Sequence, residues 1–599
     1  MAKEVALRIA VLVKQVPRVE DMTLGKGGRL EREGVELEMN AYCRRAVSKG
    51  VELVRADGGR CVVFTLGPSS AEDVLREAVA WGADEGVLVS DPAFAGSDTL
   101  ATARALAAVL SARGPWDLVL TGRNSIDADT GQVGPEVAEL LDLPFASGVR
   151  ELEIAAGNAL ARCELDDGWR EVRVRLPAVL SVAERLTAPS KVPPEGRAAV
   201  PAELITRSTA GSLGPGPWGE AGSPTRVGQV RTMDVPRHRR VLGGSAAEQV
   251  GSAIELLREW GVLGAQSAGG HSAGAEPGAG VVGPPAARRS GAPVVAVLAE
   301  PGRPRVCREL LGEAAHLALK IEGVVRAVGP ELPEASELEA WGADGTVRIA
   351  GAAVEEDVAG ALVKWCEATR PWAVLAPGTL WGREVAARAA ARLGAGLTGD
   401  AVGFGVQAGR LVAWKPAFGG RLVAAITASS EIQMATARPG VLALRDPRQA
   451  VQQIAEDVVE TSARGRVEVI AAERHDEVEA LLSARAVVAV GAGIDPQEYA
   501  GLDPLLKALD AELAASRKVT DNGWLPRARQ VGVTGHSVDP AIYVAVGISG
   551  KFNHMVGSRS AGTVVAINSD PQAPVFDWAD VGIVADWHEV VPLLAQALG

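Results

Sequence analysis

The chain has 599 residues, of which 47% are hydrophobic and 23% are charged, a composition typical of globular domains. The length is sufficient for about four domains of ~150 residues each. The formal net charge is -13, and basic residues cluster only at 237–240, so phosphate-rich nucleic acid is not an expected partner.

No apolar run approaches the ~20 residues that a membrane span needs, so direct membrane insertion is not expected. The apolar run near the N-terminus stops at Lys14 without a cleavage pattern and is typical of a first strand rather than a signal peptide. Five cysteines and seven histidines show no metal-ligand or disulfide spacing. We therefore expect a soluble cytoplasmic protein without a metal centre.

Residues 1–187 alternate short buried strands with helical patterns. Strands are predicted at 9–13, 61–66, 87–89 and 118–120, with helices between them. Such alternation is typical of a doubly wound parallel sheet.

The next two intervals interrupt this pattern. Residues 188–262 are Pro-rich and irregular and then carry one helix, at about 246–260, so we expect an extended arm that wraps another surface. Residues 263–293 are almost entirely Gly, Ala, Ser and Pro, which cannot bury enough apolar surface to order the chain. We interpret 263–293 as a flexible linker, with an end-to-end distance of roughly 30 Å, that joins two once-separate proteins.

Two further alternations follow, at 294–465 and at 466–599. The fold class predicted for the whole chain is α/β, with three doubly wound parallel-sheet domains, an arm and a linker. A shared fold is compatible with the patterns of the first and second alternations, but their sequences differ too much to predict a repeat.

The loop Gly122–Pro135 (GRNSIDADTGQVGP) follows a predicted strand and opens a helix. Such a loop is typical of a phosphate site, in which backbone N–H groups bind the phosphate. The spacing fits equally well with a tight strand–helix connection in which Asp127 or Asp129 caps the helix. Asn40 and the segment 65–68 also stand at predicted strand ends, which favours binding slightly.

Polar residues follow several predicted strands of the third alternation: Thr534, Ser549, Asn568 and Asp586. This convergence is typical of a dinucleotide site at the carboxyl edge of a parallel sheet. Each signal by itself indicates a binding site only weakly. The turn 491–493 (Gly-Ala-Gly) is also typical of a turn that simply ends a buried strand. In the same way, Arg517 by itself could equally be a cation at the C-terminal end of a helix, and His554 could equally be a helix residue on the surface.

The motifs resemble those of electron-transfer flavoproteins. Residues 487–594 (QVGVTG, PAIYVAVGISGKFNH, AINSDPQAPVF, ADVGIVAD) are similar to the FAD domain of the family's α subunit, and 374–440 (LAPGTLWGRE, KPAFGG, QMATARPG) to its N-terminal domain. Residues 1–262 (VLVKQV, MNAYC, GRNSIDADTGQVGP, LPAVLSV) are similar to the β subunit. The resemblance implies a β–α fusion with two nucleotide-α-hydrolase-like domains and one Rossmann-like FAD domain.

The resemblance implies that FAD contacts Ser516, Arg517, Val531, Gly532, Val533, Thr534, Ser549, Gly550, Lys551, Phe552, Asn553, His554, Asn568, Asp586 and Trp587. In particular, it implies Arg517 against the isoalloxazine, the Thr534 hydroxyl at flavin N5 and His554 facing the C2 carbonyl. A cation near N1–C2 would stabilise the negative charge of the reduced flavin.

A second nucleotide is implied in the β-like half. It is AMP in simple carriers of the family and a second FAD, reduced by NADH, in bifurcating relatives. It would contact Leu12, Asn40, Ala41, Tyr42, Cys43, Leu66, Gly122, Asp127, Asp129, Thr130, Gly131, Gln132 and Val133. The run 129–135 (DTGQVGP) is more similar to the bifurcating type, which leaves AMP and FAD both open.

Some positions depart from the family pattern. Ala492, Val533 and Asn553 stand where Arg, Gln and Gln are common, which bears on the flavin potential more than on its binding. The region 188–197 lacks the leucine anchor of members that dock on acyl-CoA dehydrogenases.

The function implied is a redox carrier between a dehydrogenase donor and a membrane-associated quinone oxidoreductase. The alternatives are a two-FAD bifurcating protein that oxidises NADH and a nucleotide-binding regulatory protein without redox function.

Overall fold

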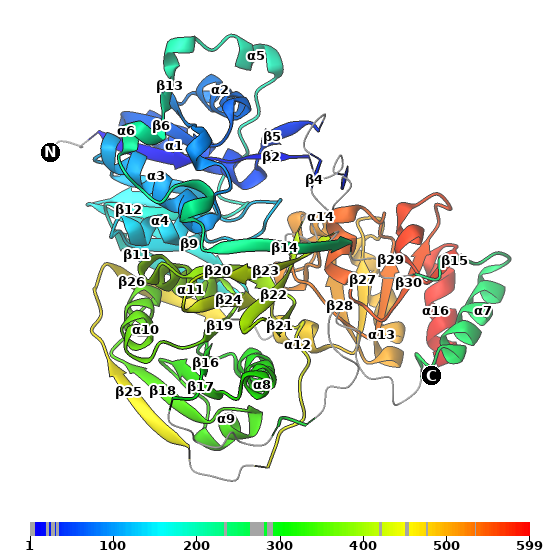
Figure 1. Cartoon of the computed structure of the whole chain (residues 1–599). Coiled ribbons are helices and arrows are strands. Elements are labelled where there is room, and N and C mark those ends of the chain that lie inside the picture. The colour runs from blue at the N-terminus through cyan, green and yellow to red at the C-terminus, as the bar shows by residue number, and fades with distance from the viewer. Residues whose placement is uncertain are drawn as a thin grey trace.

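A computed structural model describes residues 6–18, 23–24, 30–31, 35–232, 237–263, 281–283, 291–417, 422–449, 454–474, 477–532 and 535–598. Three sheets dominated by parallel strands organise these residues, which confirms the predicted α/β fold class. We name the first unit (6–213), the second unit (291–460) and the third unit (237–263 with 477–598). The first lies above the second, and the third lies beside both (Figure 1).

The first sheet has ten strands, seven of them parallel. In spatial order they are β13 (Ile205–Ser208), β7 (Glu85–Val89), β6 (Gly59–Leu66), β1 (Leu7–Leu12), β8 (Leu118–Gly122), β12 (Ala178–Val182), β9 (Phe145–Ala155), β10 (Asn158–Leu165), β11 (Gly168–Arg175) and β26 (Val467–Arg474). The last four pair antiparallel, an extension that the sequence did not predict.

The second and third sheets are parallel throughout. The second consists of β20 (Gly396–Ala401), β24 (Gln433–Ala437), β19 (Ala373–Pro377), β16 (Val294–Leu298), β17 (Val324–Gly329), β18 (Gly345–Ala350) and β25 (Ala455–Glu460). The third consists of β15 (Arg240–Val241), β31 (Val581–Val584), β30 (Thr563–Asn568), β29 (Ile542–Val546), β27 (Ala486–Val490) and β28 (Ala511–Ala515).

The remaining strands form three smaller sheets. They are β14 (Thr225–Thr232), β23 (Leu422–Ala428), β22 (Arg410–Ala417) and β21 (Gly403–Gln407), then β2 (Gln15–Pro17) with β5 (Leu37–Met39), then β3 (Thr23–Leu24) with β4 (Leu30–Glu31).

Helices cover both faces of the large sheets. The first unit holds α1 (Ala41–Asp57), α2 (Glu72–Trp81), α3 (Thr99–Arg113), α4 (Val133–Leu140), α5 (Pro194–Ala198) and α6 (Ala210–Leu213). The second unit holds α8 (Pro304–Ile321), α9 (Ala335–Trp341), α10 (Glu355–Thr369) and α11 (Leu380–Leu393). The third unit holds α7 (Ala246–Glu259), α12 (Glu477–Ser483), α13 (Asp503–Leu509), α14 (Arg517–Asp521), α15 (Phe552–Met555) and α16 (Trp587–Leu598).

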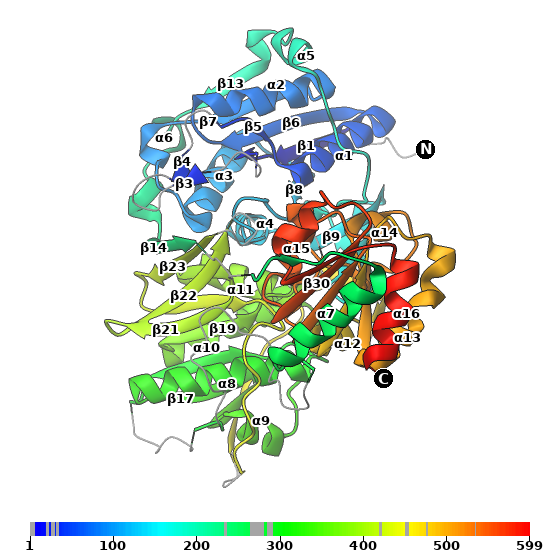
Figure 2. The ribbon, with the colours of Figure 1, turned by 90° about the vertical axis from the view of Figure 1, so that its right-hand side faces the viewer.

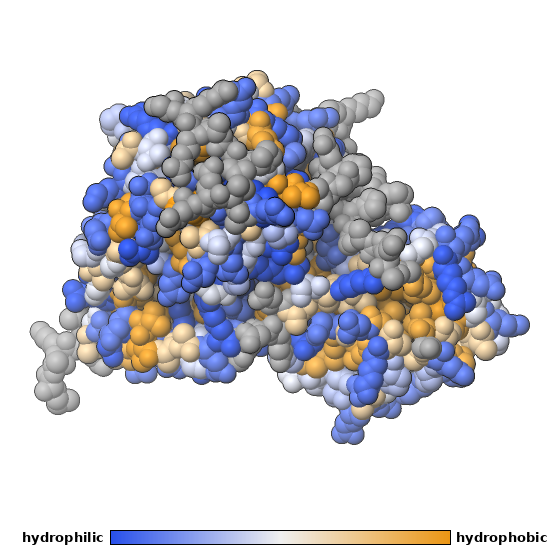
Figure 3. Space-filling model, turned by 90° about the horizontal axis from the view of Figure 1, so that it is seen from below, coloured by the Kyte–Doolittle hydropathy of each residue, from blue (hydrophilic) through white to orange (hydrophobic). Residues whose placement is uncertain are grey.

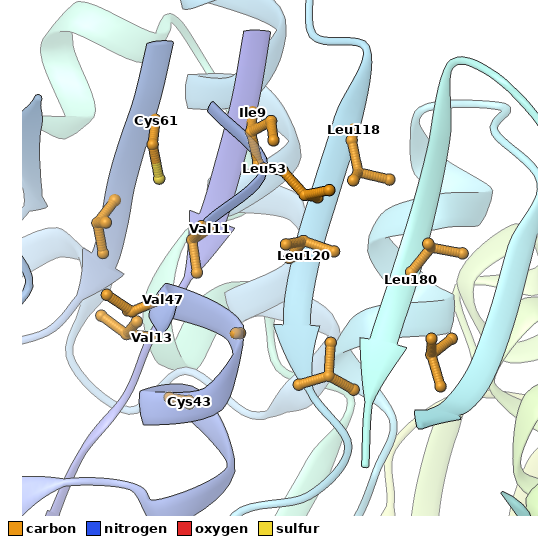
Figure 4. Packing of buried hydrophobic residues seen from close by; sticks show 14 of the residues in the cluster. Ile9, Val11, Val13, Cys43, Val47, Leu53, Cys61, Leu118, Leu120 and Leu180 are labelled. Atoms are coloured by element: carbon orange, nitrogen blue, oxygen red, sulfur yellow. The ribbon is translucent and has the colours of Figure 1, made fainter. Parts of the chain in front are cut away.

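The strands are almost fully apolar because both of their faces are buried. Along β1, Ile9 and Val11 pack on one face of the sheet, whereas Ala10 and Leu12 pack on the other. Figure 4 shows Ile9 beside Leu118 and Val11 beside Leu120 of β8, with α1 over them. Successive side chains of a strand point to opposite faces, so one short apolar run supplies two cores.

The first and second units have one topology. The order β13-β7-β6-β1-β8-β12-β9 in the first corresponds strand for strand to β25-β18-β17-β16-β19-β24-β20 in the second. Helices α1 to α4 likewise correspond to α8 to α11 in chain order. The two units therefore have one fold, as the two nucleotide-α-hydrolase-like domains implied by the resemblance predict, although their sequences did not indicate a repeat.

Each copy gives a strand to the other. After its edge strand β13, the first unit continues into β14, which pairs antiparallel with β23 of the second unit. After β25, the second unit continues into β26, which pairs antiparallel with β11 of the first unit. Residues 466–474, which the sequence places in the third domain, thus belong to the first sheet. This exchange joins the halves by backbone hydrogen bonds (Figures 1 and 2).

The third unit also combines both halves of the chain. The predicted helix at about 246–260 is present as α7, which packs on α16, and β15 extends the third sheet. Buried Arg237 donates to the Asp580 carboxylate at 2.8 Å, and the Gln249 side chain bonds both N–H and C=O of Val584. In the view from below, the largest hydrophobic area lies on this unit (Figure 3).

Most of the predicted linker, 263–293, lies outside the described residues. Within 263–293, the described segment 281–283 packs against the second unit: Val282 is buried and its N–H donates to the Asp446 carbonyl. Arg448 donates to the carbonyl of Gly283 at 3.0 Å. A buried valine and two hydrogen bonds hold this segment, although its composition is typical of an unpacked linker.

Candidate functional site: two loops at the carboxyl ends of parallel strands

The third sheet collects the predicted FAD residues along one edge. Strands β28, β27, β29 and β30 are parallel neighbours, so their carboxyl ends lie together. The predicted residues that follow these strands are Ser516 and Arg517 after β28, Ser549 to His554 after β29, and Asn568 at the end of β30. Asp586 and Trp587 follow β31, further along the same edge.

Two glycine turns form this edge because no side chain fits there. A Cβ on Gly491 would lie 1.9 Å from the Gly547 carbonyl oxygen. Gly550 has a φ of 81°, and its Cβ would lie 2.0 Å from the Val575 nitrogen. No acceptor within the described residues takes the backbone N–H groups of 549–551. Successive amides of this kind fit the pyrophosphate of a dinucleotide.

The turn 531–534 is described only in part. Val531 is buried, and its N–H donates to the Ala515 carbonyl at 3.0 Å, which ties the turn to the end of β28. Val533 and Thr534 lie outside the described residues, as do the side chains of Phe552 and Asn553. The predicted contact of Thr534 with flavin N5 therefore stays a prediction.

His554 has two hydrogen-bond partners within the protein, and its predicted contact with the flavin C2 carbonyl stays a prediction. Its Nε2 is 2.8 Å from the Tyr543 hydroxyl, and its Nδ1 is 3.1 Å from the Val531 carbonyl oxygen. Burial lowers the pKa of this imidazole to about 4, so the ring is neutral at neutral pH. A carbonyl only accepts, so the proton is on Nδ1 and Nε2 accepts from Tyr543. The ring thus holds the 531 turn and carries no positive charge.

Arg517 begins α14 and is partly exposed. Its guanidinium lies 3.3 Å from Glu184, which follows β12 of the first unit, and 3.1 Å from Asp521. Arg527 lies 3.3 Å from the other oxygen of Glu184. The buried carboxylate therefore joins the first unit to the FAD edge through two cations. Motif reasoning missed Glu184 and Tyr543, although both stand beside or within the quoted motifs.

The adenosine-end residues make local contacts. Asn568 donates to the Ile548 carbonyl at 2.9 Å, which closes the turn after β29. The exposed Asp586 accepts from the backbone and ring nitrogens of His588, and this partner lowers its pKa.

The loop 122–135 is a second strand-end site, in the first unit. It follows β8, whose neighbour β1 ends at Leu12, and β6 beyond β1 ends at Leu66. Asn40, before α1, is fully buried: its Nδ2 donates to the Asn124 carbonyl and its Oδ1 accepts from the Ile126 N–H. The predicted residues Asn40 to Cys43 thereby lie against the loop.

The two aspartates of this loop do not cap α4. The residue before the helix is Gln132, which makes no side-chain cap bond, so that alternative is wrong. Asp127 pairs with Lys14 at 2.8 Å, and although burial opposes ionisation, this partner lowers its pKa. The pKa of Asp129 is raised, mostly by burial and to a smaller extent by the negative charge of Asp400.

The loop lies where the first and second units meet. Asp400 accepts from Arg383 and Arg438, and Lys415 donates to the Gly399 carbonyl at 2.8 Å. A Cβ on Gly399 would lie 2.8 Å from Gln132 Nε2 and 3.4 Å from the Thr130 Cα.

Several buried polar atoms of this loop region have no partner within the described residues. They are Arg123 Nε, Asn124 Oδ1, Gln132 Nε2 and Glu136 Oε2. Gly131, with a φ of 64°, brings the backbone close to Asn124, because a Cβ there would lie 2.9 Å from Asn124 Oδ1. Unpaired buried donors and acceptors are costly, so a bound polar molecule fits this loop.

No helix within the described residues is both long and apolar enough to cross a membrane. Among the same residues, no group of three or more His, Cys, Asp or Glu side chains is placed to hold a metal ion.

Parallel sheets with glycine turns and polar loops at their carboxyl edges define a nucleotide-binding α/β protein. Comparison with known proteins specifies the family. The electron transfer flavoprotein domain model matches residues 27–208 and again 286–474, and the electron transfer flavoprotein FAD-binding domain model matches 480–559. The chain therefore belongs to the electron transfer flavoprotein family, and the double match agrees with the duplicated topology.

Curated relatives match either half of the chain. The electron transfer flavoprotein subunit beta of Thermoanaerobacterium thermosaccharolyticum is 35% identical over 42% of this chain and 98% of its own length. The subunit alpha of the same organism is 37% identical over 49% of this chain and 93% of its own length. The caffeyl-CoA reductase-Etf complex subunit CarD of Acetobacterium woodii is 34% identical over 42% of this chain and 98% of its own length. The chain is thus a β–α fusion.

Proposed function

We propose that this chain is a redox carrier that holds one FAD at the carboxyl edge of the third sheet and passes electrons between a dehydrogenase and a quinone oxidoreductase. The observation that carries the proposal is the row of amides at 549–551 that has no acceptor among the described residues, in a domain that matches the family's FAD-binding model. When bound, FAD supplies the one- and two-electron chemistry of the carrier.

The protein's own residues orient the cofactor and set the charge around it. The amides of 549–551 bind the pyrophosphate, and Asn568 holds the turn that carries them. Because His554 is neutral, Arg517 supplies the positive charge near the flavin, and Glu184 positions its guanidinium from the first unit. The flavin edge therefore depends on residues from both halves of the chain.

The second site holds AMP or a second FAD. The four unpartnered polar atoms of the 123–136 region and the close approach at Gly131 support a bound nucleotide there. A second FAD reduced by NADH, as in bifurcating members, is the alternative that the DTGQVGP run favours. Similarity to a subunit of a caffeyl-CoA reductase-Etf complex suits a donor or acceptor that forms a complex with the carrier.

Cofactor counting tests the proposal. Nucleotides released from the purified chain by heat are separated and quantified per chain. One FAD with one AMP supports the simple carrier, and two FAD with bleaching of the flavin absorbance by NADH supports the bifurcating alternative. A colourless protein that binds only AMP contradicts both and supports the regulatory alternative.

A pair of variants separates the two sites. Gly550→Ala removes the FAD turn of the third unit and should lower only the FAD count that belongs to this site. Gln132→Ala should lower the nucleotide count of the first unit and leave the third-unit FAD in place. Loss of both nucleotides from either variant would contradict two independent sites.

A further inference from the structure

The Thr99 hydroxyl lies between two buried side chains of the 122–135 loop region. Its Oγ1 is 3.0 Å from Gln132 Oε1 and 3.0 Å from Glu136 Oε1. Thr99 is the first residue of α3, Glu136 is in the first turn of α4, and Gln132 directly precedes α4. Gln132 is 1% exposed and Glu136 is 0% exposed, so water does not supply further hydrogens.

One hydroxyl hydrogen cannot serve both oxygens. If Glu136 is protonated, it donates to Thr99, Thr99 donates to Gln132 Oε1, and Nε2 of the amide is left without a partner. If Glu136 is ionised, Thr99 donates to it, and the amide reverses so that Nε2 donates to Thr99 and Oε1 is left without a partner. The amide oxygen and nitrogen are nearly equal in size, so both arrangements fit one set of heavy-atom positions.

We propose that Thr99 and Glu136 decide which end of the Gln132 amide faces the nucleotide of the second site, a donor when Glu136 is protonated and an acceptor when it is ionised. This inference rests on the proposed second nucleotide. When Glu136 is protonated, Gln132 Nε2 donates to a hydrogen-bond acceptor of that nucleotide, such as a phosphate oxygen or a ring nitrogen.

The surroundings of Glu136 favour the protonated form at neutral pH. Burial and, after it, the charge of Asp98 raise the pKa of this carboxyl to about 8, against the opposing effects of the Thr99 hydrogen bond and the Arg104 charge. Asp98 is the N-cap residue of α3, and Arg104 lies in the same helix as Thr99. On α11, which packs on the other side of α4, Arg388 and Arg392 pair with Glu139 instead.

The pH dependence follows from this equilibrium. Between pH 7 and pH 9 the protonated fraction of a carboxyl with a pKa near 8 falls about tenfold. If only the protonated form presents the donor, AMP affinity falls by about the same factor. The AMP phosphate, with a second pKa of about 6, does not titrate in this range, so the ligand itself does not cause the change.

Calorimetric titration of AMP into the full-length chain, freed of second-site nucleotide, tests the inference. Wild type should lose about tenfold in affinity from pH 7 to pH 9. Glu136→Gln, whose amide donates to Thr99 as a protonated carboxyl does, should keep the pH 7 affinity throughout. Thr99→Val should weaken AMP binding and remove its pH dependence. Thr102→Val, one turn further along α3, is the matched control and should behave as wild type.

The outcomes distinguish the two proposals. If AMP binds wild type with one affinity from pH 7 to pH 9, or if Glu136→Gln keeps the tenfold loss, the relay is wrong while the second site stands. If neither AMP nor FAD binds the first unit at any pH, the second nucleotide site is wrong, and the relay with it.

Discussion

Tyr543→Phe tests whether the hydrogen-bonded histidine supports the FAD edge. The substitution removes one buried hydroxyl that donates to His554 Nε2 over 2.8 Å and leaves the ring volume almost unchanged. A buried nitrogen left without its donor costs about 1–3 kcal/mol. His554 holds the Val531 carbonyl, so this cost falls on the conformation that binds FAD. The expected result is an FAD dissociation constant raised about 5- to 150-fold.

The assay is recovery of flavin fluorescence on dilution of the FAD-loaded chain. Tyr499→Phe is the matched control, because the Tyr499 hydroxyl has no hydrogen-bond partner within the described residues, and it should leave FAD affinity unchanged. If Tyr543→Phe retains FAD as wild type does, the pair does not support the 531 turn. If both variants lose FAD equally, general destabilisation rather than the lost hydrogen bond is responsible.

Three further substitutions give distinct outcomes. Gly550→Ala should abolish FAD retention, because its Cβ meets backbone at 2.0 Å, whereas Gly405→Ala, with nothing within 4 Å, should retain FAD; equal retention would contradict the turn geometry. Arg388→Met removes the cation that pairs with buried Glu384 and one of the two that pair with Glu139, and should lower the free energy of unfolding by about 3–5 kcal/mol, measured in denaturant. Arg370→Met breaks an exposed pair and should have almost no effect. Arg517→Ala should weaken FAD binding and make the flavin midpoint potential more negative, and an unchanged redox titration would contradict its role as the cation.

Local sequence was sufficient to predict the strands and the edge of the FAD site. The apolar runs at 9–13, 61–66, 118–120 and 542–546 overlap β1, β6, β8 and β29, because a parallel strand is buried on both faces whatever its neighbours are. Turn glycines and polar residues after such runs mark the carboxyl ends, and parallel pairing brings these ends together.

Side-chain partners could not be predicted in the same way. The contact of His554 with the flavin stays a prediction, whereas its protein partners, Tyr543 of β29 and the Val531 carbonyl, were not predicted. Glu184, which directs Arg517, is 333 residues away in sequence and belongs to the other half of the chain. Asp129 was expected as a cap or a nucleotide contact, and its environment also includes Asp400 of the second unit. Partners this remote in sequence have no periodicity or spacing that reveals them.

The sequence by itself predicted three parallel-sheet domains with polar strand ends near the C-terminus, and its motifs resembled a β–α fusion of the electron-transfer flavoprotein family. These features depend on local patterns of apolar runs, glycines and polar tips. Only the tertiary structure decided that the first two units exchange β14 and β26. Strand order and strand exchange depend on backbone pairing between distant segments, and backbone hydrogen bonds are the same for every sequence.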